Sequence, residues 1–147
     1  LQVLKVETNA GWELLQSLAP EQRAKAVIAN EPYADILTRR GDEAHTAAPT
    51  GITLRDLTAP QRRLVMEIVQ EYAGTFPEAA AASYLDKVRQ AADEVHFAWA
   101  GGTTPGDAIY YRIHGPDFLI EFDNRSGEPN HIHSVWYDLR NTFGKAL

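Results

Sequence analysis

The sequence predicts an α+β fold in which N-terminal helices pack on a C-terminal four-stranded antiparallel β-meander. Over residues 9–92 the apolar residues recur every three or four positions, which is the spacing of one helix face. Over residues 94–138 the period changes to two, as is typical of strands that bury one face. Turns rich in glycine and proline separate these alternating segments, so neighbouring strands are expected to run antiparallel.

Two helices are expected in the first thirty residues. Asn9 can cap a short first helix. Pro20 suits the first turn of a second helix, which is expected to continue through Val27 and Ile28. A weaker alternation over residues 1–8 predicts a short strand in front of them.

The third and fourth helices have clearer start signals. Thr58, followed three residues later by Gln61, predicts a capping box for a helix over residues 59–74. Pro77 is expected to begin an alanine-rich fourth helix that ends near Ala92. All of these helices are interpreted as structural.

Two of the helix starts resemble each other. Residues 18–23 read Leu-Ala-Pro-Glu-Gln-Arg and residues 57–62 read Leu-Thr-Ala-Pro-Gln-Arg. Six residues are too few to establish an internal repeat, so we interpret the likeness as two similarly capped helices.

Residues 30–51 are polar and are interrupted by prolines and glycines, which predicts a long loop with one helical turn at most, over residues 34–38. Loops of this length in a compact domain are often functional or mobile. A solvated loop accounts most simply for its ionisable residues, which are otherwise minor candidates for a lid: Arg39, Arg40, Asp42 and His45.

The predicted meander consists of residues 95–100, 109–114, 118–123 and 131–138. A two-residue loop at Gly115 and Pro116 would pair Ile113 with Phe118. This pairing places the large apolar residues of both strands on one face. A slip by two residues would preserve the same faces.

The last strand is expected to return symmetrically across the next loop. Asp123 would then pair with His131, and Glu121 with His133. The polar face of the meander would carry most of the ionisable residues: His96, Tyr110, Arg112, Glu121, Asp123, His131 and His133. A solvated strand face ordinarily favours Lys, Thr and Glu, whereas this combination suits metal ligation or proton transfer.

His131 and His133 are the clearest chemical signal. Two histidines one residue apart in a strand point to the same face, roughly 6 to 7 Å apart at Cα, so both imidazoles can reach one metal ion. Glu121 would lie about 5 Å from His133 on the neighbouring strand and complete the ligand set. His96 would lie three strands away, roughly 14 Å in a flat sheet, and would join only if the sheet curled into a barrel. Paired strand histidines also occur as hydrogen-bonded core or interface residues.

The composition narrows the classes of function. A chain of 147 residues can bury one sizeable core, which predicts a single domain over residues 1–147. The net charge of -6 and the dispersed basic residues argue against nucleic acid as a partner. Because the chain has no cysteine, a metal would have to be held by His, Asp or Glu. No apolar run is long enough to cross a membrane. No helix is expected after the glycines near residue 101, so the sequence does not predict a phosphate-binding loop for an organic cofactor.

Several motifs resemble the domain-of-unknown-function family numbered 3500. They are His96-Phe97-Ala98-Trp99-Ala100-Gly101, Tyr110-Tyr111-Arg112-Ile113, Gly115-Pro116, Phe118-Leu119-Ile120-Glu121-Phe122-Asp123-Asn124 and Asn130-His131-Ile132-His133-Ser134-Val135-Trp136. The helical segments 17–28 and 57–73 are similar too, so the resemblance covers nearly the whole chain. It implies no established activity. It implies instead the C-terminal half of a longer, duplicated and often exported protein, in which arginine is commoner where this chain has Tyr137.

These observations predict a metal-binding domain, a candidate metal-dependent hydrolase or oxidoreductase that would hold zinc, copper or iron and act on a small-molecule substrate. The residues assigned to it are His131, His133 and Glu121 as metal ligands, His96 as a further ligand or general base, and Arg112 and Tyr110 as groups that orient the substrate. The competing class is a non-catalytic interaction domain whose polar sheet face packs on a second half-domain or subunit.

Overall fold

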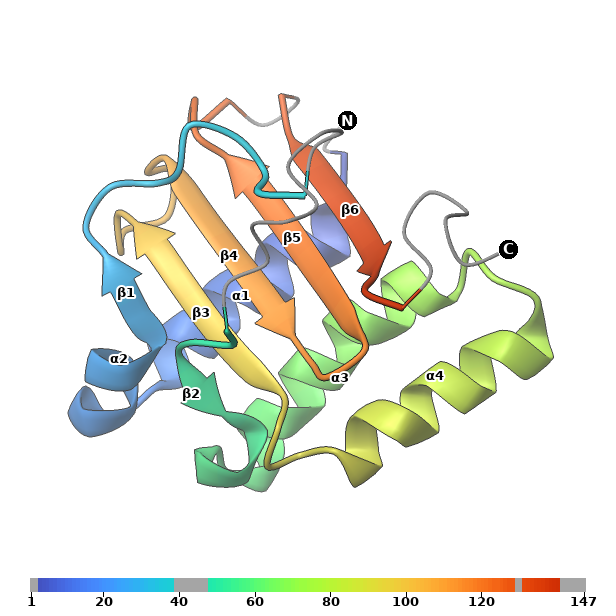
Figure 1. Ribbon diagram of the computed structural model, residues 1–147. Coiled ribbons are helices and arrows are strands. Elements are labelled where there is room, and N and C mark those ends of the chain that lie inside the picture. Colours follow the sequence, from blue (N-terminus) through green and yellow to red (C-terminus); the bar gives the residue numbers. More distant parts are fainter. Residues whose placement is uncertain (1–2, 39–47, 129–130, 141–147) are drawn as a thin grey trace.

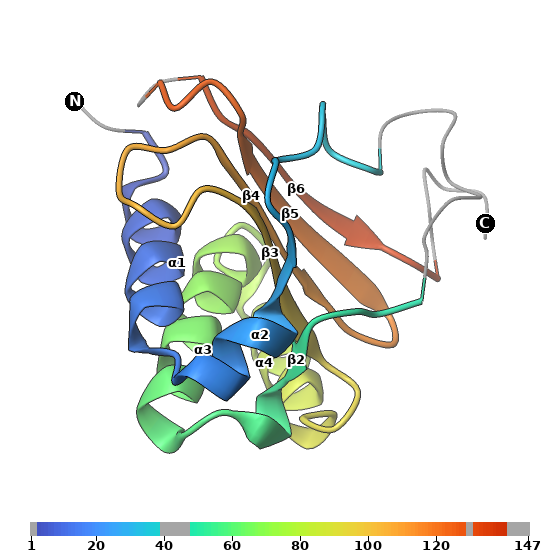
Figure 2. The same cartoon turned by 90° about the vertical axis from the view of Figure 1, so that its left-hand side faces the viewer.

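The computed structural model describes residues 3–38, 48–128 and 131–140. It has the expected α+β architecture, with α1, α3 and α4 on one face of the sheet (Figure 1 and Figure 2). The helices are α1 (Lys5–Ser17), α2 (Pro20–Ala26), α3 (Ala59–Ala73) and α4 (Glu78–Gln90), with a short 3-10 helix at Leu54–Asp56. The strands are β1 (Val27–Ala29), β2 (Ile52–Thr53), β3 (His96–Gly101), β4 (Ile109–His114), β5 (Phe118–Asn124) and β6 (His133–Asp138). No helix in these ranges is both long and apolar enough to cross a membrane.

The sheet is larger than the predicted meander and is mixed. Strands β3 to β6 form the four expected antiparallel strands, β1 lies parallel to β3 at one edge, and β2 pairs with the first two residues of β3. Strand β1 corrects the prediction that Val27 and Ile28 extend the second helix. These residues are β-branched, and β-branched side chains favour strands. Val27 pairs with Trp99 of β3, a contact distant in sequence that helical spacing does not reveal.

The first helix also corrects a prediction. The weak alternation over residues 1–8 suggested a strand, but α1 begins at Lys5. Its buried face includes Leu14 and Leu15, which are fully buried. An alternation of a few residues fits one turn of such a helix as well as it fits a strand, so the pattern was too short to separate the two.

The core lies between the helices and the sheet. Tyr111 of β4 stacks between Trp99 of β3 and Phe122 of β5, with ring centroids 6.0 and 4.7 Å apart. Gly11 of α1 faces this stack, and a Cβ built there would lie only 2.7 Å from Cε1 of Tyr111. The side chain of Trp12 packs edge-on against Trp99, with ring centroids 4.9 Å apart. Helix α1 is therefore fitted directly to the aromatic centre of the sheet.

The turn between β4 and β5 determines their register. The N–H of Gly115 donates to the carbonyl of Phe118 at 2.9 Å, so Pro116 and Asp117 form the two-residue loop. Ile113 consequently pairs with Ile120, and not with Phe118 as predicted. The fixed φ of proline suits the second position of a β-turn, whereas the predicted loop placed Pro116 third. The slip is two residues, so each side chain stays on its predicted face.

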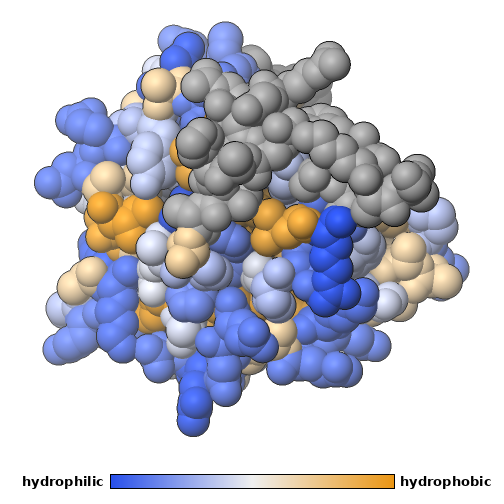
Figure 3. Space-filling model, in the orientation of Figure 1, coloured by the Kyte–Doolittle hydropathy of each residue, from blue (hydrophilic) through white to orange (hydrophobic). Residues whose placement is uncertain are grey.

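The face of the sheet opposite the helices is covered by the chain itself. Residues 30–38 run from β1 across the upper ends of β4 and β5 toward β6 (Figure 1, cyan). Thr38 at the end of this segment is buried. The predicted solvated loop therefore begins as a packed segment, while residues 39–47, with Arg39, Arg40, Asp42 and His45, lie outside the described residues. Figure 3 shows this side of the molecule, where the described surface is mainly hydrophilic.

Candidate metal centre

Asp123 on β5 and His133 on β6 lie directly opposite each other in the antiparallel ladder. The predicted pairings were Asp123 with His131 and Glu121 with His133, so β6 is displaced by two residues from the expected register. The connection that precedes it is two residues longer than predicted, because the strand begins at His133 and not at His131. As a result, the carboxylate across from His133 belongs to Asp123.

A third ionisable side chain, Asp35, reaches the same place from the segment that follows β1. Nδ1 of His133 lies 2.9 Å from Oδ1 of Asp35 and 3.9 Å from Oδ2 of Asp123. One ligand-type atom from each of the three residues lies within 4.8 Å of the other two. An ionised Asp35 can only accept a hydrogen bond, so Nδ1 of His133 is the donor in this pair. Two carboxylates and one imidazole thus converge from three separate parts of the chain.

The cluster lies at the margin between core and solvent. The side chain of Asp123 is 2% exposed, whereas those of Asp35 and His133 are 34% and 42% exposed. Burial raises the pKa of Asp123, His133 opposes that rise, and the Asp35 carboxylate adds to it. A cation placed among these groups would favour the ionised form of Asp123. The site therefore combines one buried carboxylate, Asp123, with two side chains that solvent reaches, Asp35 and His133.

His131 lies beside this cluster, just before β6. Its imidazole ring centroid is 5.3 Å from that of His133, and the two ring planes are inclined by 39°. His131 is exposed, and its backbone N–H donates to the carbonyl of Glu128 at 3.4 Å. The predicted histidine pair is therefore close together in space, although His131 precedes the strand. The preceding Asn130 lies outside the described residues.

The side chain of Glu121 is occupied by other contacts. It is fully buried and accepts hydrogen bonds from the N–H of Leu37 at 2.7 Å and the N–H of Thr38 at 3.0 Å. The hydroxyls of Thr38 and Tyr110 donate to it as well, at 2.5 and 2.7 Å. The register places Glu121 opposite Val135, two residues along the strand from the pair formed by Asp123 and His133.

Tyr110 and Arg112 belong to the same buried face. Burial raises the pKa of Tyr110, and the neighbouring Glu121 carboxylate raises it further, so its hydroxyl is a hydrogen-bond donor. Arg112 is 4% exposed and donates from Nη2 to the hydroxyl of Thr50 at 2.5 Å. Its Nε has no hydrogen-bond partner among the described residues. Both side chains lie beneath the segments that cover this face.

His96 lies at the opposite end of the face. It pairs across the strands with His114, whereas His133 pairs with Asp123 at the far end of the ladder. The two sites are three strands apart, which is about 14 Å across the sheet, and about four residues apart along it, which adds about 13 Å. The strand order β1-β3-β4-β5-β6 describes an open path and not a closed barrel. The structure therefore does not bring His96 to the two histidines near β6.

Asp35 is the residue that the sequence analysis missed. It lies in the long loop over residues 30–51, within the segment expected to form at most one helical turn. The unusual length of that loop was the only signal, and it pointed equally to Asp42 and His45. A loop residue has no periodicity to indicate which face of the sheet it will reach.

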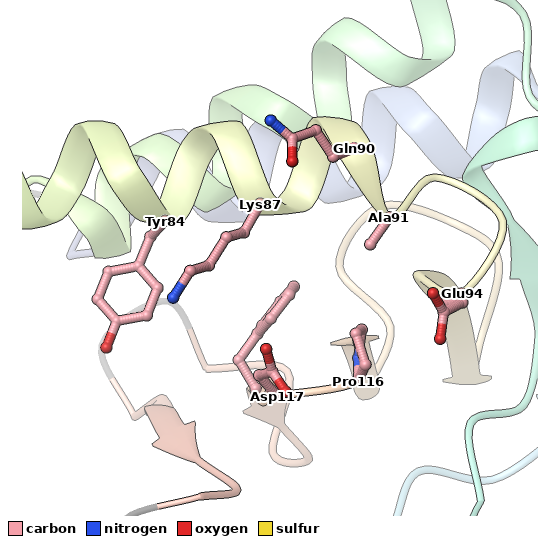
Figure 4. Close-up of a pocket in the computed structure, with 8 residues that line it drawn as sticks. Tyr84, Lys87, Gln90, Ala91, Glu94, Pro116 and Asp117 are labelled. Atoms are coloured by element: carbon pink, nitrogen blue, oxygen red, sulfur yellow. The ribbon is translucent and has the colours of Figure 1, made fainter.

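A groove beside the start of β5 lies elsewhere and contains none of the predicted site residues. It has a volume of about 260 Å³ and lies between α4 and the turn before β5 (Figure 4). Two of its charged side chains have partners within the chain: Lys87 Nζ lies 5.5 Å from the ring centroid of Tyr84, and Asp117 pairs with Arg140 at 2.5 Å. These contacts account for Lys87 and Asp117 without a ligand.

Comparison with known families identifies the chain. A family model described as "Protein of unknown function (DUF3500)" matches residues 1–145. The chain belongs to this family, as its motifs indicated. No curated protein and no solved structure was found to match it.

Proposed function

We propose that this domain binds a divalent transition metal ion through Asp35, Asp123 and His133, with His131 available as a fourth ligand. The observation that carries the proposal is the convergence of one ligand-type atom from each of the first three residues within 4.8 Å. Ligands bound to zinc at about 2.0 to 2.2 Å in a tetrahedron lie about 3.4 Å from one another. The separations of 2.9 and 3.9 Å around Nδ1 of His133 bracket this value.

The ligand chemistry favours zinc, copper or iron. Imidazole nitrogen suits all three ions, and the chain has no cysteine that would select for thiolate chemistry. Two aspartates together would neutralise the charge of a divalent ion. Since calcium and magnesium prefer sites built entirely from oxygen, the imidazole argues for a transition metal.

The exposure of the site suits chemistry on a small-molecule substrate. Asp35 and His133 are each about one third to two fifths exposed, so an ion beside them would keep a face open to solvent. An ion with an open position can activate a bound water or polarise a carbonyl group. A metal-dependent hydrolase or oxidoreductase is the corresponding class of enzyme. Glu121, which the sequence suggested as a ligand, is replaced in this proposal by Asp123.

The alternative is a non-catalytic interaction domain whose polar sheet face binds a second half-domain or subunit. That function needs the face to be accessible. Tyr110, Arg112 and Glu121 are at most 4% exposed within this single chain. Their burial gives the alternative little support, because a partner could not reach them without displacing residues 30–38.

The test is metal analysis of the purified protein after it has been loaded separately with zinc, copper and iron and then dialysed. We expect close to one ion per chain for at least one metal, and loss of that ion in Asp123→Asn and His133→Ala. Asp86→Asn is the matched control, since Asp86 is exposed on α4, where it pairs with Arg89. Absence of any metal after loading, or equal metal in the wild type and both site variants, would overturn the proposal.

A further inference from the structure

The segment that carries Asp35 has no regular secondary structure of its own. Residues 33–38, here called the strap, follow β1 and cross the sheet as turns and bends. Such a segment lacks the repeated backbone hydrogen bonds that fix a helix or strand, so its position depends on contacts with the sheet. Asp35 is the one residue of the strap whose carboxylate meets His133.

The start of the strap is held by one ring contact and one hydrogen bond. The ring of Tyr33 packs edge-on against Tyr110, with centroids 4.7 Å apart. The guanidinium of Arg125 donates to the carbonyl of Ala34. Arg125 is exposed, so this second contact is only a weak constraint on the strap.

The end of the strap is held by Glu121. Its two carboxylate oxygens accept three hydrogen bonds from Leu37 and Thr38, which are two and three residues beyond Asp35. Hydrogen bonds to an ionised carboxylate are about twice as strong as neutral ones, and these lie in a fully buried site. The hydroxyl of Tyr110 orients the same carboxylate. Glu121 is therefore the strongest described attachment of the strap to the sheet.

We infer that Glu121 is a positioning residue for the metal centre: it holds the strap so that Asp35 reaches the ion, and it does not bind the ion itself. This inference rests on the proposed function. It also explains the surroundings of Glu121. This buried carboxylate lies next to the centre on the polar face, but all its described hydrogen bonds come from the strap and Tyr110.

The inference is tested by a double-mutant cycle on zinc affinity with Glu121→Gln and Asp35→Asn. A glutamine at 121 presents an NH2 group to the N–H donors of Leu37 and Thr38 and should release the strap. Loss of an outer-shell group typically lowers metal affinity by about 10- to 100-fold. We expect Glu121→Gln to fall in this range and Asp35→Asn, which removes a ligand, to lose at least as much. Glu121→Gln should add less than about threefold in the Asp35→Asn background. Multiplicative losses would mean that Glu121 acts on the ion independently of Asp35, and would overturn the inference.

A milder variant guards against a general loss of structure. Thr38→Val removes one hydroxyl donor to Glu121 and keeps both backbone donors. We expect Thr38→Val to lose less zinc affinity than Glu121→Gln. This smaller loss should disappear when Asp35 is also replaced. Circular dichroism of each variant checks that the fold is retained.

A metal-free measurement separates this inference from the proposed function. Nitrogen-15 NMR of His133 at a pH where the ring is neutral reports which nitrogen carries the proton. Asp35 should hold that proton on Nδ1 in the wild type, and both Asp35→Asn and Glu121→Gln should shift it toward Nε2, with Asp86→Asn unchanged. If the wild type binds no metal, the proposed function fails. The tautomer of His133 still shows whether Glu121 positions Asp35. An unchanged tautomer in Glu121→Gln would overturn the positioning role.

Discussion

The side-chain amides of Gln22 and Gln61 hydrogen-bond to each other in both directions, with Nε2 to Oε1 distances of 3.0 and 2.9 Å. Each amide also caps its own helix, since Gln22 accepts from the N–H of Ala19 and Gln61 from the N–H of Thr58. The second donor of each amide reaches the chain just before the other helix, at the carbonyls of Asp56 and Ser17. The two similar helix starts in the sequence therefore meet in a locally two-fold arrangement.

This arrangement predicts that Gln61 contributes strongly to stability. Gln61 is 5% exposed, so Gln61→Ala leaves Gln22 and the carbonyl of Ser17 with unsatisfied hydrogen-bonding groups. We expect a loss of about 2 to 3 kcal/mol in the free energy of unfolding. Urea denaturation measures it, with Gln70→Ala on the exposed face of α3 as the control, for which we expect less than about 0.5 kcal/mol. Equal effects at the two positions would contradict the prediction.

Gly11 is predicted to resist replacement although it lies within a helix. Alanine usually stabilises an exposed helix interior by about 1 kcal/mol relative to glycine. Here the new Cβ would lie 2.7 Å from the buried ring of Tyr111, which is itself stacked between two aromatic rings. We expect Gly11→Ala to destabilise the protein by about 1 to 3 kcal/mol, the usual cost of overpacking.

Thermal and urea unfolding of Gly11→Ala provide the measurement. Ser83→Ala, an exposed position on α4, is the control and should be close to neutral. A stabilised Gly11→Ala protein would show that α1 does not pack tightly on Tyr111.

His114 is predicted to make stability fall in mild acid. Burial, followed by the positive charge of Arg112 and the neighbouring His96, lowers its pKa from 6.5 to about 4. Between these two pH values the unfolded chain binds the proton and the folded chain does not. The contribution of His114 to the free energy of unfolding is therefore fully present above pH 6.5. It is lost as the pH falls toward 4, by about 3 kcal/mol in all.

Urea denaturation between pH 7 and pH 4 tests this dependence. His114→Gln cannot take up the proton in either state, so its stability should decline less steeply than that of the wild type over the same range. Parallel curves for the two proteins would exclude His114 as the cause.

The two histidines near β6 are predicted to contribute unequally to metal affinity. His133 contacts both aspartates, whereas His131 is exposed and lies outside the strand. We expect His133→Ala to lower zinc affinity by about 100-fold and His131→Ala by about 10-fold, the upper and lower ends of the range typical of residues that support a metal site.

Isothermal titration calorimetry of the two single variants distinguishes them. If His131→Ala lost as much affinity as His133→Ala, the histidines would be equivalent ligands, which would contradict the prediction.

Local patterns determined a large part of this structure. The change of period from 3.6 to 2 separated the helices from the strands, and the alternation assigned each residue of β3 to β6 to the correct face. Both results follow because side-chain direction is a property of neighbouring residues in one element. The capping box at Thr58 was likewise readable because its two partners are three residues apart.

The tertiary structure decided what depends on residues distant in sequence. Alternation is unchanged by a slip of two residues, so the sequence could not choose between Glu121 and Asp123 as the partner of His133. The start of β6 at His133 made that choice. Asp35 was beyond prediction because it is 98 residues from His133 and lies in an irregular strap. The sequence by itself determined the polar face and its two histidines, and only the packing of the strap on that face brought the second carboxylate to them.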